Sequence, residues 1–363
     1  MPEAKKAATA NGKARGATPA ASEVRADTRL QRLEWTVFKR LDGLLQGDWR
    51  TFFRGHGLDL AELREYQHHD DVRRIDWNVT ARLNQPFVRE YLEDREATAW
   101  FLLDLSPSID FGTRARKRSL AVDLVAVLAT ALVRKGHRVG AHLYGRLVAT
   151  PRGRKATVAP VGAEAPVPAR SGRRQVLELM QRIGERPRPA LVQGGSANGE
   201  GTRLDRMLHA AHANLRGRCV VFVVSDFISA PGWDAPLGAL ARRHDVVAVR
   251  IVDPAEREMP DVGLIPMVDA ETGERMMVDT SSAKFRERYA KAAARREAEV
   301  HEALARAGVD TLELDTGEDL ANALLRFVHA RRERARLTAG GMPRRPQRSA
   351  TPASSTSRAT SAA

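Results

Sequence analysis

The 363-residue chain lacks three features that would each define a class of protein. Its only cysteine, Cys219, excludes a disulfide framework within one chain, and its place beside an apolar run predicts a small buried residue rather than a nucleophile. No stretch of about 18 uncharged apolar residues occurs, and the basic N-terminal region has no apolar signal core. We therefore expect a cytoplasmic protein without a transmembrane segment.

Motifs for nucleotides and zinc are also missing. The sequence has no Gly-x-x-x-x-Gly-Lys-Ser/Thr loop for ATP and no Gly-x-Gly-x-x-Gly turn for a dinucleotide. The histidines His56, His68 and His69 have no cysteine partner and no helical His-x-x-x-His spacing, which argues against zinc. Any ATP hydrolysis linked to this protein would therefore belong to a partner.

The net charge of +14 is concentrated in the two terminal segments. Residues 1–25 carry a charge of +3 and residues 331–363 carry +7, and both are poor in apolar residues. This composition predicts disordered tails, which could touch nucleic acid without sequence specificity. The body has no recognition helix, zinc finger or aromatic stacking motif, so specific nucleic-acid binding is not expected.

The body of the chain alternates strand and helix patterns, which predicts an α/β fold with a doubly wound, mostly parallel sheet. Before the first of these units we expect a helical and hairpin extension, with a strand near residues 87–92 beside the one at 99–104. A surface loop is expected at 150–170 and a hairpin at 264–278. The predicted helices span 30–45, 119–135, 175–186, 203–214, 235–243, 284–307 and 320–330, and the further strands span 138–144, 220–224, 246–252 and 311–314.

Oxygen-bearing side chains follow two of the predicted strands. Asp104, Ser106 and Ser108 form an Asp-x-Ser-x-Ser pattern after the apolar run 100–103, and Asp226 comes shortly after Val220–Val224. Thr202 opens the segment between them. Hydroxyl and carboxylate oxygens suit a hard cation such as Mg²⁺, and ligands of α/β sheets bind beyond the carboxyl ends of the strands.

Each of these residues also has an explanation that needs no metal. Ser-Pro-Ser is a common turn sequence, Asp226 is a favourable helix cap, and Thr202 is a favourable N-cap for the helix at 203–214. The ordered combination of all of them favours the metal site.

The set resembles the metal-ion-dependent adhesion site of von Willebrand factor A domains, and all five of its positions are filled. The resemblance implies that Ser106 and Ser108 bind Mg²⁺ or Mn²⁺ directly, and that Thr202 binds it directly or through water. Asp104 and Asp226 would act mostly through waters. The open metal position would accept a carboxylate from a partner protein.

A second resemblance covers the segment before this motif. Gly57–Leu60, Arg64-Glu65-Tyr66, Asp70–Trp77, Thr80-Ala81-Arg82, Pro86 and Val88-Arg89 resemble the signature of the DUF58 family, bacterial proteins with a von Willebrand A-like domain. The family implies association with a MoxR-type AAA+ ATPase in protein assembly or metal insertion. The predicted division is a tail at 1–25, the signature segment at 26–97, the von Willebrand A-like domain at 98–330 and a tail at 331–363.

The charged signature residues have two interpretations. Arg64, Arg73 and Arg82 balance the charges of Glu65, Asp71 and Asp76, which favours a salt-bridged platform anchored by Tyr66 and Trp77. The alternative is a partner-binding face.

The sequence therefore favours a metal-dependent protein-interaction module that is not an enzyme. One alternative is a metal-dependent phosphohydrolase with Asp104 as nucleophile. Ser106 stands where such an enzyme would normally carry a second aspartate, and no lysine is placed as an obvious phosphate clamp. The other alternative is non-specific nucleic-acid binding through the basic tails.

Overall fold

The computed structural model describes most of the body of the chain. The described residues are 19–41, 62–67, 72, 75–90, 97–145, 162–163, 166–185, 203–268 and 275–338. Thr202, a predicted site residue, lies outside them, as do residues 1–18 and 339–363 of the predicted tails.

The central sheet confirms the predicted fold class. Five parallel strands stand in the order β11-β8-β7-β3-β4, and β4 is flanked by two short antiparallel strands, β5 and β6. The bounds are β3 Thr98–Asp104, β4 Arg138–Gly145, β5 Gly162–Ala163, β6 Val167–Arg170, β7 Val220–Ser225, β8 Asp245–Val252 and β11 Asp310–Asp315. The strands β5 and β6 lie in the region predicted as a surface loop, where proline-rich sequence hid two short edge strands from the sequence pattern.

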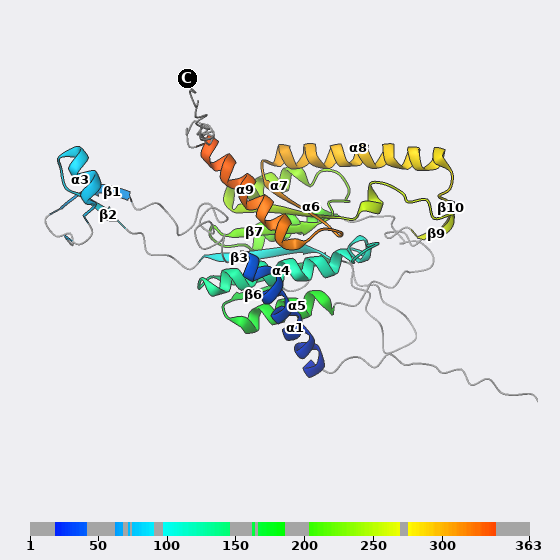
Figure 1. Ribbon diagram of the computed structural model, residues 1–363, viewed down its shortest axis with the longest axis horizontal. Coiled ribbons are helices and arrows are strands. Elements are labelled where there is room, and N and C mark those ends of the chain that lie inside the picture. Colours follow the sequence, from blue (N-terminus) through cyan, green and yellow to red (C-terminus); the bar gives the residue numbers. More distant parts are fainter. Residues whose placement is uncertain are drawn as a thin grey trace, which may run out of the picture.

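Helices cover both faces of the sheet, as a doubly wound fold requires (Figure 1). One face packs against α1 Pro19–Leu33, α4 Lys117–Arg134, α5 Arg173–Gly184 and α9 Leu320–Thr338, and the other packs against α6 Leu204–Asn214, α7 Asp234–Arg243 and α8 Ala283–Ala307. The central strands are buried on both sides, which explains why Val220–Val224 is a continuous apolar run. Phe101 and Phe222 stack in neighbouring strands with ring centroids 5.2 Å apart.

The inner residues of both predicted tails, 19–25 and 331–338, are helical. The helix α1 already begins at Pro19 and continues through the π-helical turn η1 Glu34–Phe38. Arg29 of α1 forms an ion pair with Asp123 of α4. This polar residue of α1 therefore contacts a neighbouring helix and does not face only solvent. At the other end α9 runs to Thr338, because Arg331 is buried and pairs with carboxylates of the sheet.

The signature segment corrects one prediction of strand pairing. The strand β2 Phe87–Glu90 pairs antiparallel with β1 Glu62–Glu65, and not with β3. Alternation within a short strand fixes which residues share a face but not which strand pairs with it.

Part of the predicted salt-bridged platform, including Asp71 and Arg73, lies outside the described residues. Buried Asp76 accepts a 3.3 Å hydrogen bond from Val79 N, at the start of α3 Trp77–Leu83. Trp77 is 69% exposed and therefore is not a buried anchor.

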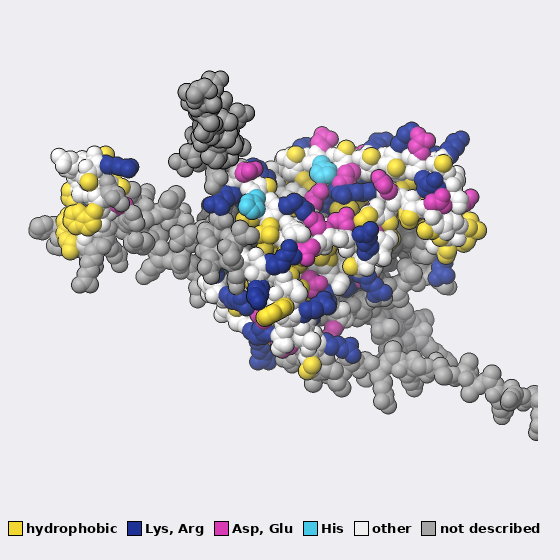
Figure 2. All heavy atoms as spheres, in the orientation of Figure 1, with side chains coloured by type: hydrophobic (Ala, Val, Ile, Leu, Met, Phe, Trp, Pro, Cys, Tyr) yellow, Lys and Arg dark blue, Asp and Glu magenta, His cyan; other side chains and the backbone are white. Residues whose placement is uncertain are grey.

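The predicted hairpin is present as β9 Leu264–Val268 and β10 Arg275–Asp279, which pair antiparallel. Leu264, Met276 and Met277 are exposed on it, and Figure 2 shows apolar side chains gathered over this hairpin. Within the described parts of the chain, no helix is both long enough and apolar enough to cross a membrane.

Candidate functional site

The predicted site residues that the structure describes meet at the carboxyl ends of two adjacent strands. Asp104 is the last residue of β3, and Asp226 directly follows β7. Because these parallel strands pair in register from Ala99 with Val220 to Leu103 with Val224, the two carboxylates end at the same edge of the sheet. Asp104 and Asp226 are 2% and 3% exposed.

The two serines converge in the loop after β3. Ser106 precedes and Ser108 lies within the 3-10 turn η3 Pro107–Asp110, and their Oγ atoms are 3.0 Å apart. A side chain at Gly145 would obstruct this loop, because its Cβ would lie 2.7 Å from Leu105 O. Two adjacent ligands of octahedral Mg²⁺ are separated by ~2.9 Å, so the two hydroxyls have the spacing of neighbouring ligands.

Asp104 is fixed by hydrogen bonds to both of its oxygens. Ser106 N donates to Oδ1 at 3.0 Å, and Ser225 Oγ donates to Oδ2 at 2.8 Å. Burial, followed by the nearby negative charge of Asp226, raises the pKa of Asp104 to about 6. The fixed carboxylate could hold a metal-bound water, which is the role that the resemblance to the adhesion site implied.

The backbone turns sharply after Asp226. Ile228 N donates to Asp226 Oδ1 at 3.0 Å, while Phe227 has a φ of +59°, a left-handed conformation that costs a non-glycine residue about 1 kcal/mol. Phe227 N donates to Ser225 Oγ at 2.9 Å, and its buried ring packs 5.0 Å from that of Trp233. These contacts hold the Asp226 carboxylate in place beside Asp104.

A buried lysine at this site was missed in the sequence. Lys117, the first residue of α4, has a fully buried side chain, and its Nζ donates to Asp226 Oδ2 at 3.0 Å and to Glu256 Oε1. Burial lowers the pKa of Lys117, but the charges of Asp226 and Glu256 together raise it above its ordinary value. Nothing in the sequence singled out Lys117, and its pairing with two carboxylates does not make it a phosphate clamp.

Glu256 reaches the site from a compact turn after β8. It ends the 3-10 turn η4 Pro254–Glu256, where Asp253 and Glu256 form a reciprocal capping box. Asp253 also accepts hydrogen bonds from Thr113 N at 2.8 Å and from Thr316 Oγ1 at 2.6 Å. Burial raises the pKa of Glu256, so this carboxylate depends on Lys117 for its charge compensation.

Tyr144 presents a polar group that nothing in the described structure satisfies. It pairs in register with Asp104 in the neighbouring strand β4 and is 2% exposed. Its hydroxyl has no hydrogen-bond partner among the residues that the structure describes, and burial raises the pKa of Tyr144 to about 12. Buried hydroxyls rarely remain unpaired, so this orphan is a place for a ligand or for a metal-bound water.

These observations fit a divalent cation of the Mg²⁺ type. The donor set is hydroxyl and carboxylate oxygen, with two hydroxyls at ligand spacing and an unsatisfied hydroxyl near Asp104. Ser106, Ser108, Asp104 and Asp226 could hold such an ion, with Lys117 already bound to one oxygen of Asp226.

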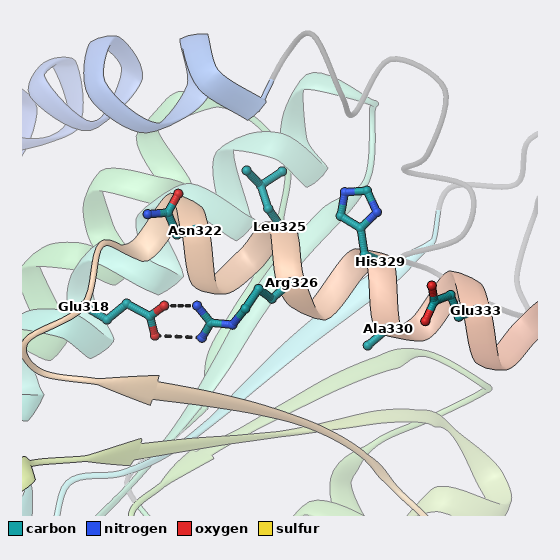
Figure 3. Close-up of a pocket in the computed structure, with 7 residues that line it drawn as sticks. All are labelled: Glu318, Asn322, Leu325, Arg326, His329, Ala330 and Glu333. Carbon is teal, nitrogen blue, oxygen red and sulfur yellow. Dashed lines mark hydrogen bonds and ion pairs between the residues drawn. The ribbon is translucent and has the colours of Figure 1, made fainter. Parts of the chain in front are cut away.

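Other clusters fit a ligand less well. Glu297, His301 and Glu313 place one ligand atom each within 4.8 Å of one another, but Arg250 forms ion pairs with both glutamates. A hollow of about 740 Å³ follows α9, where Arg326 pairs with Glu318 (Figure 3). None of its lining residues belongs to the candidate site.

The lining of a second hollow begins at Phe227, the residue after Asp226. The hollow measures about 390 Å³ and is lined by the segment after Asp226, from Phe227 to Asp234, and by one face of α8. Arg296, Glu299 and Arg306 supply charged groups on the α8 side.

The structure defines an α/β protein with a mostly parallel sheet that is covered by helices on both faces. A family model described as "Protein of unknown function DUF58" matches residues 62–299, and the chain belongs to that family. The uncharacterized protein Rv1480 of Mycobacterium tuberculosis is 36% identical over 310 residues, which cover 84% of this chain and 90% of that protein. The uncharacterized protein MAV169 of Mycobacterium avium is 38% identical over 170 residues, covering 47% of this chain and 95% of that protein.

Two solved structures resemble the chain distantly. The BatB protein of Bacteroides thetaiotaomicron has 13% identity and a TM-score of 0.36, covering 65% of this chain and 99% of that chain. An aerotolerance-related membrane protein of Bacteroides fragilis has 12% identity and a TM-score of 0.37, covering 64% of this chain and 99% of that chain.

Proposed function

We propose that this protein is a metal-dependent protein-interaction module that binds Mg²⁺ or Mn²⁺ between β3 and β7. The observation that carries the proposal is the convergence of the Ser106 and Ser108 hydroxyls, 3.0 Å apart, beside the buried carboxylate of Asp104. Ser106 and Ser108 bind the ion directly, and Asp104 and Asp226 hold its waters. Thr202 is the further ligand that the family pattern implies.

The partner supplies a carboxylate to the open metal position. A site whose direct ligands are neutral hydroxyls leaves most of the ion's charge available, which favours an acidic partner group. The hollow lined from Phe227 onward, of about 390 Å³, gives that partner a second place of contact. The family resemblance makes a MoxR-type AAA+ ATPase the partner we propose, with protein assembly or metal insertion as the shared task.

Phosphohydrolysis with Asp104 as nucleophile is less well supported. Both oxygens of Asp104 accept hydrogen bonds, and its side chain is buried. Lys117 supplies a cation nearby, but its ammonium is fully buried and is already paired with two carboxylates, so it is not exposed to a substrate.

The test is calorimetric titration of the intact chain with Mn²⁺. Ser106→Ala and Ser108→Ala should each weaken binding at least tenfold, while Ser281→Ala, at an exposed serine, should bind like the wild type. Tyr144→Phe should weaken binding less, because it removes only a group placed to hold a bound water. Equal heats in all variants would remove the serines from the site.

Partner binding is tested by co-purification with the organism's MoxR-type ATPase in Mg²⁺ and in EDTA. Association should occur in Mg²⁺ with the wild type and with Ser281→Ala, and should be lost in EDTA or with Ser106→Ala. Association that survives both EDTA and Ser106→Ala would exclude the adhesion-type mechanism.

A further inference from the structure

Lys117 occupies an unusual place for a lysine. Its side chain is completely buried at the start of α4, and its Nζ lies between the carboxylates of Asp226 and Glu256. The ring of Phe111 is 6.0 Å from Nζ and belongs to the loop that carries Ser106 and Ser108. A lysine is rarely buried unless it is paired, so the two carboxylates are the reason that it stays there.

This ammonium and a divalent cation would both be attracted to the Asp226 carboxylate. Asp226 has two oxygens, of which Oδ1 accepts from Ile228 N and Oδ2 accepts from Lys117 Nζ. A cation or a metal-bound water that approaches Asp226 Oδ2 must therefore share that oxygen with Lys117 or displace it. Two positive charges close together in a buried site repel each other strongly.

The net charge of the cluster also depends on Lys117. Asp104, Asp226 and Glu256 contribute three negative charges when ionised, and Lys117 removes one of them. One divalent cation then brings the cluster to neutrality, whereas without Lys117 the loaded cluster would keep a negative charge. A neutral loaded site can accept a partner's carboxylate, and a negative one would repel it.

Glu256 holds the lysine in this position. It is fixed by the capping box of η4, and Tyr289 on α8 donates a hydrogen bond to Ala255 O at 2.9 Å within the same turn. The turn is therefore anchored independently of any metal, and Lys117 keeps its place at the sheet edge through Glu256.

We propose that Lys117 is an internal counter-ion that competes with the metal for Asp226 and thereby sets a weak metal affinity, keeping the bound ion able to capture a partner's carboxylate. This inference rests on the proposed metal-binding function. Removing a metal ligand weakens metal binding. Removing Lys117 should instead make the metal bind more tightly.

The experiment measures Mn²⁺ affinity by calorimetry on the intact chain. Lys117→Met, which keeps the length and removes the charge, should bind Mn²⁺ at least tenfold more tightly than the wild type. Lys117→Arg retains the charge and should stay close to the wild type. The matched control is Lys135→Met, at the exposed opposite end of the same helix, which should leave the affinity unchanged.

If Lys117→Met does not fold without metal, the Mn²⁺ affinity of Glu256→Gln provides a second test. This variant keeps the lysine and removes one of its partners, so Mn²⁺ should bind at least threefold more weakly than in the wild type. If Lys117→Met folds only when Mn²⁺ is added, the ion has replaced the missing cation, which supports the proposal.

The possible failures are distinguishable. Equal, measurable Mn²⁺ affinity in the wild type, Lys117→Met and Glu256→Gln would overturn the role of Lys117 and leave the proposed metal site intact. Absence of Mn²⁺ binding in every variant would overturn both the metal site and the inference that rests on it.

Discussion

The substitution Asp104→Asn should stabilise the metal-free protein at high pH and destabilise it at low pH. Burial and the charge of Asp226 raise the pKa of Asp104 from 3.8 to about 6, so the folded state binds this proton more tightly than the unfolded state. The ionisation penalty is absent below pH 3.8, grows between pH 3.8 and about 6, and is complete above that range. At 1.36 kcal/mol per pKa unit, the penalty is about 3 kcal/mol.

Asparagine cannot ionise and therefore escapes this penalty. Its carbonyl can still accept from Ser106 N, but its NH2 group faces Ser225 Oγ, which donates to Asp104 in the wild type. Turning that hydroxyl costs about 1 kcal/mol. The variant should thus gain about 2 kcal/mol at pH 8 and lose about 0.5 kcal/mol at pH 4, where the wild type carries only a small part of the penalty.

Urea unfolding without divalent cations, from pH 4 to pH 8, measures this difference. Asp234→Asn is the control, and its stability should change with pH in the opposite direction. A hydrogen bond from Arg306 lowers the pKa of Asp234, so the ionised Asp234 stabilises the wild type and this stabilisation is lost as the pH falls. An Asp104→Asn variant that is equally destabilised at pH 4 and at pH 8 would refute the argument that the ionised carboxylate is costly.

Further variants probe the frame around the site. Arg331→Met should lower the free energy of unfolding by about 3–5 kcal/mol, because it leaves two sheet carboxylates without their buried partner, whereas Arg295→Met, at a largely exposed pair, should change it by less than about 1 kcal/mol. Burial raises the pKa of Cys219 to about 11, so iodoacetamide should leave the native protein unmodified at pH 8 but label it in urea; rapid native labelling would contradict that burial. Deleting residues 1–41 removes the buried apolar face of α1 and should cost at least ~5 kcal/mol in urea unfolding, and an unchanged midpoint would show that α1 does not stabilise the sheet.

The parallel sheet could be predicted because its signals are local. A continuous apolar run such as Val220–Val224 identifies a strand buried on both faces, and Asp104 and Asp226 follow from their positions at strand ends. The pairing of β2 with β1 could not be predicted in this way, because strand periodicity carries no information about the partner.

Lys117 was hidden for a different reason. In the sequence it is one basic residue before Arg118 at the start of a helix, and nothing nearby distinguishes it from a solvated lysine. Its role arises only when the loops after β7 and β8 bring Asp226 and Glu256 to it. The Asp253-Pro254-Ala255-Glu256 sequence did carry a usable signal, since its end residues match a capping box.

The DUF58 match and the folded unit of this protein do not have the same limits. The match begins at Glu62 and ends at Glu299, inside α8, so α1, β11 and α9 all lie beyond it. A recombinant fragment cut at the family limits would strip β11 from β8 and leave the long apolar edge of β8 open to pairing with other chains. Such a fragment would be prone to aggregate, and a low yield from it would say little about the fold or the metal site of the intact chain.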